Sequence, residues 1–554
     1  MTRTNPFLSW RGDSSVFQYL PIAILRAVFV LVAICAFATN ATSAQMPSAT
    51  VKSPACSALP GIEFSSLQDA PTQIVSSESM AASGHSPAYC KVVGYVNPEV
   101  GIEVHLPVAK DWNGKLITAG NGGWAGALSG EACDAHVERG YACVTTDTGH
   151  RGRGDDGLWA VNNLAAQVDF GYRAIHVATL AAKAIVNRFY AKDAQKSYFM
   201  SCSTGGYQGL VEAQRFPWDF DGIISGAPDM DEADLTMRNI WDLVSSFDKN
   251  GKQILDAAAL KLLHQAALDQ CDMDDGVKDG IVSNPVACRV DPSKLLCKEG
   301  TSQGCLSATQ VEAARRIYDG PPHSDGKAVR GALGGSELGW NYGGYPKYVD
   351  SLFEYMIYGA SPGWTSANFD FEHDYKRLGL GALYTDTNPD LRRFKAAGGK
   401  LLVYQGGTDA NEMPTAILDY YETVEKVIGG QAPTQEFFRF FIVPGMNHCG
   451  GGVGAYSIDY LTYLEAWVEK NQPPDEMIGA HVSESYLASL PLPEGLPADV
   501  SNEVRIAVAA GRLRFPLDPK IPLSFTRPIY PYPQFAKYAS GDPNQAKSFK
   551  PTQP

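Results

Sequence analysis

The stretch Met200-Ser-Cys-Ser-Thr-Gly-Gly206 stands between an apolar segment, residues 196–200, and a segment with helical apolar spacing, residues 207–214. A strand that passes through a tight turn into a helix lifts the serine of the turn out of the sheet, provided that the residues two before and two after it are small. Ser203 meets this condition. It also stands at a helix N-terminus, where partial positive charge and free N–H groups favour an oxyanion. The stretch therefore predicts Ser203 as a nucleophile, with an ordinary helix N-cap as the alternative.

The segments around this stretch alternate between strands and helices. Apolar runs predict strands, and a longer segment with apolar residues at helical spacing predicts a helix. The predicted strands are residues 114–119, 141–146, 196–200 and 222–225, and the predicted helix is residues 167–190. This order is typical of an α/β fold, in which a parallel sheet has helices on both faces.

The alternation stops after Pro228 and resumes near Leu391, with further strands predicted at 400–404 and 438–443. The residues between are rich in glycine, cysteine, aspartate and aromatic side chains. We therefore predict one α/β domain that is interrupted by an insertion. The predicted boundaries are 45–228 and 388–489 for the two parts of the α/β domain, 229–387 for the insertion, and 490–554 for a Pro-rich tail that packs in extended form on the surface.

Two candidate partners of Ser203 follow the late strands. Asp409 comes after the strand at 400–404, and His448 comes after the next one. An α/β-hydrolase has its acid and its histidine in this chain order, each after a late strand. The acid orients the imidazole, which takes the serine proton and returns it to the leaving alcohol. The order predicts a Ser203–Asp409–His448 triad. The alternatives are a turn-capping aspartate and a solvated histidine, and the nearest rival base, His150, precedes the serine.

An oxyanion hole needs a second backbone donor beside the N–H of Thr204. The loop Ala119-Gly-Asn-Gly-Gly-Trp-Ala-Gly126 follows an early strand, where such hydrolases have this donor. Gly123 is the first candidate and Gly122 the second. A plain glycine turn without a ligand contact is the alternative.

Residues 1–44 have the pattern of a secretory signal peptide, with arginines before an apolar run at 27–38 and small residues after it. The run is shorter than the roughly 20 residues that span a bilayer. This favours cleavage after Ala44 over an uncleaved membrane anchor. We expect a secreted or periplasmic protein without membrane contact after cleavage.

Ten cysteines follow the signal peptide, and an even number in an exported chain predicts disulfides. Short spacings favour Cys271–Cys288 and Cys297–Cys305. Cys202 and Cys449 adjoin the candidate nucleophile and base, so a bond between them would tie the two catalytic segments together. The pairing of the other four stays open, although the last two of them could form a local pair; they are Cys56, Cys90, Cys133 and Cys143.

The composition excludes several classes of protein. The formal net charge is -14, and an acidic chain without a basic run is a poor partner for nucleic acid. Hydrophobic residues make up 45% and charged residues 19% of the chain. These proportions exclude a mainly disordered or coiled-coil protein.

These motifs resemble those of the tannase and feruloyl esterase family of secreted α/β-hydrolases. That family has Cys-Ser, Asp and His-Cys elements with the two cysteines bonded, and here the elements are Cys202-Ser203, Asp409 and His448-Cys449. The resemblance extends from about residue 56 to 538. Serine replaces the usual glycine at position 201, and the tail lacks a cysteine pair that the family often has. The resemblance implies an α/β-hydrolase fold with a large inserted lid domain.

A run of aspartates in the insertion, Cys271-Asp-Met-Asp-Asp-Gly-Val-Lys-Asp-Gly-Ile281, suggests a cation site. Like charges so close repel one another, and a hard divalent cation binds such carboxylates. The alternative is a solvated acidic turn. The resemblance implies structural Ca²⁺ held by three carboxylates and two backbone carbonyls, from Asp272, Asp275 and Asp279 and from Val277 and Ile281.

The sequence therefore predicts a serine esterase that hydrolyses small esters of aromatic acids, of the feruloyl or galloyl type. The main alternative is an enzyme of the mono(2-hydroxyethyl) terephthalate hydrolase type, which the same family includes. A free carboxylate on that substrate would favour an arginine partner, and Arg330 in the insertion is the candidate. A peptidase, or a non-catalytic calcium-stabilised binding protein, is a further alternative.

Overall fold

The computed structural model describes residues 54–321, 331–340, 346–359, 364–371, 373–374, 380–412, 414–491, 500 and 502–554. Lys52–Pro554 form one compact unit. The predicted signal peptide at 1–44 and Arg330 lie outside the described residues. No helix in the described part of the chain is long and apolar enough to cross a bilayer.

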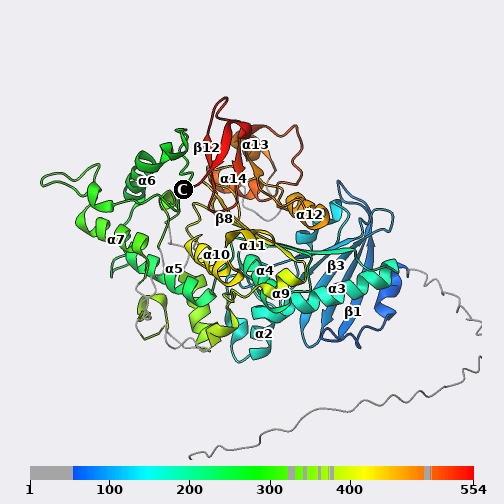
Figure 1. Cartoon of the computed structure of the whole chain (residues 1–554). Coiled ribbons are helices and arrows are strands. Elements are labelled where there is room, and N and C mark those ends of the chain that lie inside the picture. Colours follow the sequence, from blue (N-terminus) through cyan, green and yellow to red (C-terminus); the bar gives the residue numbers. More distant parts are fainter. Residues whose placement is uncertain are drawn as a thin grey trace, which may run out of the picture. The chain divides into compact units, whose positions relative to one another are not determined.

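A nine-stranded sheet with the order β1-β2-β3-β5-β4-β6-β7-β8-β9 forms the centre of the unit (Figure 1). The first four strands in this order pair antiparallel, and the pairs from β5 to β9 are parallel. The strands are β1 (Thr72–Met80), β2 (Tyr89–Val96), β3 (Val100–Pro107), β4 (Lys115–Ala119), β5 (Ala142–Thr146), β6 (Lys196–Cys202), β7 (Gly222–Gly226), β8 (Lys400–Gly406) and β9 (Phe438–Val443). All six strands predicted from the sequence are present. The prediction of a parallel sheet was incomplete, because β1 to β3 make the sheet mixed.

Helices cover both faces of the sheet. On β6, Tyr198 packs with residues of α12 on one face, and its neighbour Phe199 packs with residues of α4 and α10 on the other. Successive side chains of a strand point to opposite faces, so strands buried on both faces are continuous apolar runs. The helices are α1 (Asp134–Glu138), α2 (Leu164–Val168), α3 (Ala174–Tyr190), α4 (Thr204–Arg215), α5 (Glu232–Ser246), α6 (Ala257–Cys271), α7 (Ala308–Asp319), α8 (Pro346–Ser351), α9 (Arg392–Ala396), α10 (Pro414–Ile428), α11 (Gln431–Gln435), α12 (Tyr460–Lys470), α13 (Glu484–Ser489) and α14 (Asn502–Ala510). The helix predicted at 167–190 is α3 with the end of α2, joined by a π-helical turn at Asp169–Arg173.

The insertion lies between β7 and β8, which are neighbouring parallel strands of the sheet. It contains α5 to α8, and α5, α6 and α7 lie together beside the sheet in Figure 1. These helices share a hydrophobic cluster with the fully buried Trp340. The insertion thus has apolar packing of its own and returns the chain to the strand next to the one it left.

The C-terminal segment is not only an extended tail. Within residues 490–554 the chain forms α14, β11 (Leu523–Ile529), β12 (Phe535–Tyr538) and β13 (Phe549–Thr552). β11 pairs with β10 (Met477–Val482), which precedes the tail, and β12 pairs with β13. Main-chain pairing of β11 with β10 attaches this segment to the domain. The prediction of an extended tail from its proline content was therefore incomplete, because the segment has regular secondary structure.

All ten cysteines of the described chain are in disulfides. The two short-range pairs favoured by spacing are present, as is the pair next to Ser203 and His448. The pairing left open by the sequence is Cys56–Cys90 and Cys133–Cys143.

Candidate active site

Ser203 occupies a strained turn between β6 and α4. Its φ is 66° and its ψ is -131°, a backbone region that is rare and costly for a residue with a side chain. The turn is held by hydrogen bonds from Ser203 N to Gly226 O (2.9 Å) and from Tyr207 N to Ser203 O (3.0 Å). A Cβ at Gly205 would lie 1.9 Å from Ser201 Oγ, so the turn requires glycine there. The structure thus has the strand–turn–helix elbow that the sequence predicted around this serine.

Asp409 and His448 are in direct contact. Asp409 follows β8, His448 follows β9, and Nδ1 of the imidazole lies 2.9 Å from Oδ2 of the carboxylate. The carboxylate is buried, and three donors fix its oxygens: the backbone N–H groups of Asn411 (3.0 Å) and Glu412 (3.1 Å) and the side chain of Gln405 (3.0 Å). The arrangement sets the plane of the imidazole and leaves Nε2 as its free nitrogen.

The electrostatics of His448 suit a base that must become charged. Burial acts to lower its pKa, but the charge of Asp409 and its hydrogen bond raise the pKa above the ordinary value of 6.5, and the charge of Asp229 acts in the same direction. The nearest rival, His150, has the opposite setting. Burial lowers the pKa of His150 to about 4, and its ring stacks on Trp159 at 3.7 Å. His150 is thus a buried core residue.

A disulfide connects the elbow to the histidine loop. Cys202, directly before Ser203, is bonded to Cys449, directly after His448, and the two Cα atoms are 5.9 Å apart. The bond spans a sequence separation of 247 residues. It brings Ser203 and His448 together through covalent structure, each being one residue from a bonded cysteine.

The candidate oxyanion donors lie on two loops at the same end of the sheet. Thr204 is the first residue of α4. In the loop after β4, the amides of Asn121 and Trp124 are occupied, by Gln208 Oε1 (3.0 Å) and by Gly154 O (2.9 Å). The amides of Gly122 and Gly123 have no hydrogen-bond partner among the described residues. Gly123 has a φ of 53°.

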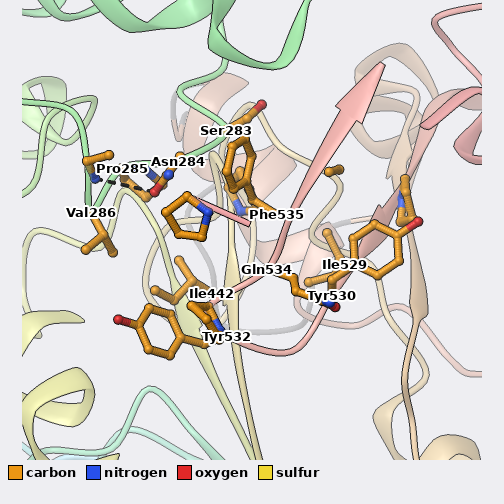
Figure 2. A pocket seen from close by; sticks show the side chains of 16 residues that line it. Ser283, Asn284, Pro285, Val286, Ile442, Ile529, Tyr530, Tyr532, Gln534 and Phe535 are labelled. Atoms are coloured by element: carbon orange, nitrogen blue, oxygen red, sulfur yellow. Dashed lines mark hydrogen bonds between the residues drawn. The ribbon is translucent and has the colours of Figure 1, made fainter. Parts of the chain in front are cut away.

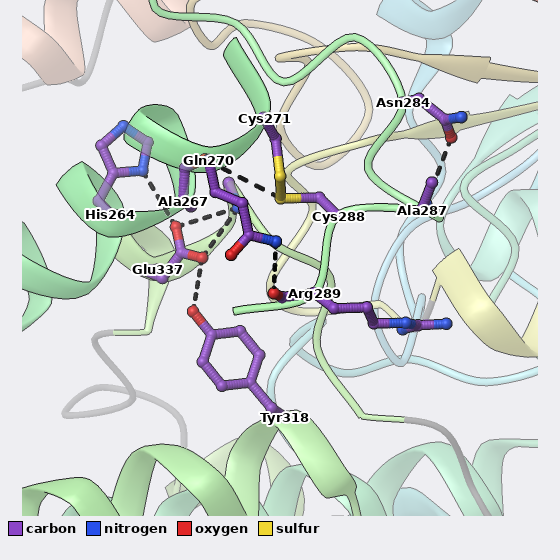
Figure 3. Close-up of a disulfide and its surroundings, with 11 residues drawn as sticks. His264, Ala267, Gln270, Cys271, Asn284, Ala287, Cys288, Arg289, Tyr318 and Glu337 are labelled. Carbon is purple, nitrogen blue, oxygen red and sulfur yellow. Dashed lines mark hydrogen bonds and ion pairs between the residues drawn. A yellow bond between two sulfur atoms is a disulfide. The ribbon is translucent and has the colours of Figure 1, made fainter. Parts of the chain in front are cut away.

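A cavity of about 340 Å³ opens beside Asp409 and His448. The loops after β8 and β9 form one side of it, and residues of the insertion form the other. His264 of α6 is part of the insertion wall, and Glu337 holds it in place at 3.0 Å from Nδ1 (Figure 3). The buried Glu337 also accepts hydrogen bonds from the hydroxyl of Tyr318 (2.7 Å) and the backbone N–H of Gly335 (2.9 Å). The insertion therefore borders the site with a fixed wall.

In the aspartate-rich loop Asp272 and Asp275 are buried, whereas about half of residues 272–281 are exposed. Asp272 Oδ1 accepts the N–H groups of Asp279 and Gly280, both at 3.1 Å, and Asp275 Oδ2 accepts the hydroxyl of Ser283 at 2.6 Å. Burial raises the pKa of both Asp275 and Asp279 above the ordinary range. Asp274, outside the predicted ligand set, is exposed.

The donor set has the chemistry that a hard divalent cation prefers, because it consists of carboxylate and carbonyl oxygens in a loop that the Cys271–Cys288 disulfide closes. Arg527 of β11 supplies one positive charge, at 2.6 Å from Asp279. One guanidinium does not balance three carboxylates.

A second cavity, of about 270 Å³, lies between residues 283–287 and the C-terminal residues 528–536 (Figure 2). Its walls are mainly apolar, with Pro285, Ile442 and Tyr532 among them. No triad residue lines it, but Pro444 at the start of the histidine loop does. The segment after the aspartate-rich loop thus packs near the loop that carries His448.

Sequence reasoning missed a group of buried carboxylates behind the triad. Asp229, three residues after the end of β7, accepts a hydrogen bond from the hydroxyl of Thr204 at 2.9 Å. Glu232 and Glu412 are buried near it, and their charges act on one another. In the sequence these residues look like turn and helix-start residues. The only signal was the place of Asp229 at the end of a strand beside the nucleophile strand.

The family model for tannase and feruloyl esterase matches residues 82–354 and 364–552 of the chain. The chain is 30% identical to mono(2-hydroxyethyl) terephthalate hydrolase of Piscinibacter sakaiensis, with 85% of each chain covered. It is 31% identical to a probable feruloyl esterase B-2 of Aspergillus flavus, with 70% of this chain and 79% of the relative covered. The crystal structure of feruloyl esterase B from Aspergillus oryzae is similar with a TM-score of 0.72 and 25% identity, over 87% of this chain and 97% of that chain.

Proposed function

The chain belongs to the tannase and feruloyl esterase family and is a carboxylic ester hydrolase, and we propose that it is a secreted serine esterase that cleaves esters of aromatic acids through an acyl-enzyme on Ser203. The observation that carries this proposal is the Asp409–His448 pair, held next to the strained Ser203 by the Cys202–Cys449 bond.

The mechanism follows from the geometry. Asp409 accepts a hydrogen bond from Nδ1–H of His448, so Nε2 can take the proton of Ser203 Oγ as the oxygen attacks the ester carbonyl. The backbone N–H groups of Thr204 and Gly123 would stabilise the oxyanion. His448 then gives its proton to the leaving alcohol. Water, deprotonated by the same imidazole, releases the aromatic acid from the serine.

We propose an α/β-hydrolase fold in which the insertion acts as a lid over the acyl group. In support, the nucleophile, acid and histidine follow β6, β8 and β9, in the chain order of that fold. The insertion also leaves the sheet after β7 and rejoins it at the acid strand β8, and it lines the cavity beside Asp409 and His448.

We propose that Ca²⁺ supports the lid as a structural ion. The carboxylates of Asp272, Asp275 and Asp279 and the carbonyls of Val277 and Ile281 would hold it. Bound there, the ion would neutralise the carboxylates and stiffen the loop. The protein's own residues perform ester cleavage without it.

For substrate, we propose feruloyl or galloyl esters first and a terephthalate monoester second. The similarity to mono(2-hydroxyethyl) terephthalate hydrolase favours the second. Relative kcat/KM on methyl ferulate, methyl gallate and the terephthalate monoester distinguishes them. A tenfold preference for the charged ester, about 1.4 kcal/mol, that Arg330→Ala abolishes would reverse this order.

A fluorophosphonate probe tests the enzyme class itself. We expect one equivalent of label, on Ser203 in the peptide map, and no label on Ser203→Ala. A protein that leaves the probe unreacted while folded would be a binding protein, and the proposed function would be wrong.

A further inference from the structure

Asp229 lies at a special place in the sheet. It follows β7, which stands between the nucleophile strand β6 and the acid strand β8. The carboxyl ends of neighbouring parallel strands meet at one edge of a sheet, so this residue lies between the segments that carry Ser203 and Asp409. It is 1% exposed.

The contacts of Asp229 lead to the reacting groups. Its Oδ2 accepts the hydroxyl of Thr204 at 2.9 Å, and the backbone N–H of Thr204 is one of the proposed oxyanion donors. Burial raises the pKa of Asp229 above its ordinary value, and the charge of His448 and the hydrogen bond from Thr204 oppose this rise. In return, the charge of Asp229 acts to raise the pKa of His448.

The charged and titratable groups around Asp229 come from four elements. Thr204 is on α4 and Glu232 is on α5. Asp409 and Glu412 lie in the loop after β8, and His448 lies in the loop after β9. Asp386 also interacts with this group, since the charge of Asp229 adds to the rise in the pKa of Asp386 that burial causes. Burial raises the pKa of Glu232 and of Glu412 well above the ordinary range. Four carboxyl oxygens of this cluster accept no hydrogen bond from the described residues: Glu232 Oε1, Glu232 Oε2, Glu412 Oε2 and Asp229 Oδ1. Buried carboxyl groups that lack other donors share protons with one another. Protonated Glu232 and Glu412 can therefore donate hydrogen bonds to an ionised Asp229.

We propose that Asp229 is a second carboxylate of the triad, a positioning residue that fixes the first turn of α4 through Thr204 and stabilises the charged form of His448. Asp409 touches the imidazole directly, whereas Asp229 acts through its charge and through Thr204. The two protonated acids Glu232 and Glu412 keep Asp229 ionised by donating hydrogen bonds to it. The inference rests on the proposed serine mechanism.

The test is the pH profile of kcat/KM on methyl ferulate for three variants. Asp229→Asn removes the charge, and we expect the acidic limb to move to lower pH by about half a unit or more, with a loss of about tenfold in the plateau rate. Thr204→Val removes the hydrogen bond but keeps the charge, and we expect a lower plateau with the limb in place. Glu412→Gln keeps a donor to Asp229 and changes no charge, so its limb should match that of the wild type.

An unshifted limb in Asp229→Asn, with a wild-type melting temperature, overturns the proposal. If Asp229→Asn does not fold, Asp229→Ser removes the charge with a smaller side chain, and the same comparison applies. Fluorophosphonate labelling of Ser203 in each variant separates this result from a failure of the proposed function. Absence of labelling in the wild type would reject the serine mechanism, whereas normal labelling with an unshifted limb rejects only the role of Asp229.

Discussion

Removal of the Cys202–Cys449 disulfide should reduce both stability and turnover. The perturbation is the double variant Cys202→Ala/Cys449→Ala. Its matched control is Cys297→Ala/Cys305→Ala, which removes a disulfide of the insertion with a sequence separation of 8 residues. Both variants lose one cross-link, but only the first adjoins Ser203 and His448.

The magnitude follows from the length of the closed loop. In the chain-entropy model, closing a loop of 247 residues destabilises the unfolded chain by about 5 kcal/mol, and a loop of 8 residues by about 2.5 kcal/mol. Two further disulfides lie within the long loop and shorten it. Because the dependence is logarithmic, this correction is only about 0.1 kcal/mol. We therefore expect the first variant to lose about twice as much stability as the control.

The assay is urea unfolding under non-reducing conditions together with kcat on methyl ferulate. The Cys202→Ala/Cys449→Ala variant should unfold at a lower urea concentration than the control. It should also lose turnover, because no disulfide then connects the segments that carry Ser203 and His448. The control should keep the turnover of the wild type. Equal losses of stability in the two variants would refute the loop-length argument, and wild-type kcat in the Cys202→Ala/Cys449→Ala variant would refute the positioning argument.

Three other predictions concern the triad and the cation loop. Ser203→Ala should lower kcat by several orders of magnitude and leave substrate binding largely intact; turnover close to that of the wild type would rule out the acyl-enzyme. Because Asp409 raises the pKa of His448 above 6.5 and catalysis needs the neutral imidazole, kcat/KM should fall as pH decreases through a value above 6.5. Asp409→Asn should shift this limb to lower pH, and a limb that stays in place would contradict the assignment. Chelation of calcium should lower the melting temperature, since an ion at 100 times its Kd adds about 2.7 kcal/mol to the free energy of unfolding. Ser203 should still react with the fluorophosphonate. An Asp275→Ala variant with the same response to calcium as the wild type would exclude the site.

The sequence could predict the strands that are buried on both faces of the sheet. Tyr198 and Phe199 face opposite layers and are both fully buried, so the centre of β6, residues 198–200, is an apolar run that indicates a buried strand. In contrast, β1 lies at the edge of the sheet, and much of Thr72–Met80 is exposed. Its place depends on pairing with β2 rather than on its own side chains. Local sequence patterns therefore could not predict that the sheet is mixed.

The candidate site divides in the same way. The tight turn at Ser203 and the contact between Asp409 and His448 could be predicted, because each follows from a local motif in a fixed chain order. Asp229 was not, since a single aspartate after a strand also fits a simple turn. Only the order of β6, β7 and β8 in the sheet brings it to Thr204, and that order is a property of the whole fold.

The loop that carries His448 explains why a covalent bond is needed there. A Cβ at Gly452 would lie 2.3 Å from Gly445 O, and one at Gly454 would lie 1.9 Å from Pro444 O, so the two arms of the loop approach too closely for larger residues. Glycine loses more conformational entropy on folding than other residues, and it offers no side chain for packing. Met446 anchors one arm of the loop in the core, but residues 450–452, which follow Cys449, are glycines and add no apolar contact near the imidazole. The Cys449 bond and the contact with Asp409 supply that constraint from two sides, which is why we expect loss of the disulfide to reduce kcat as well as stability.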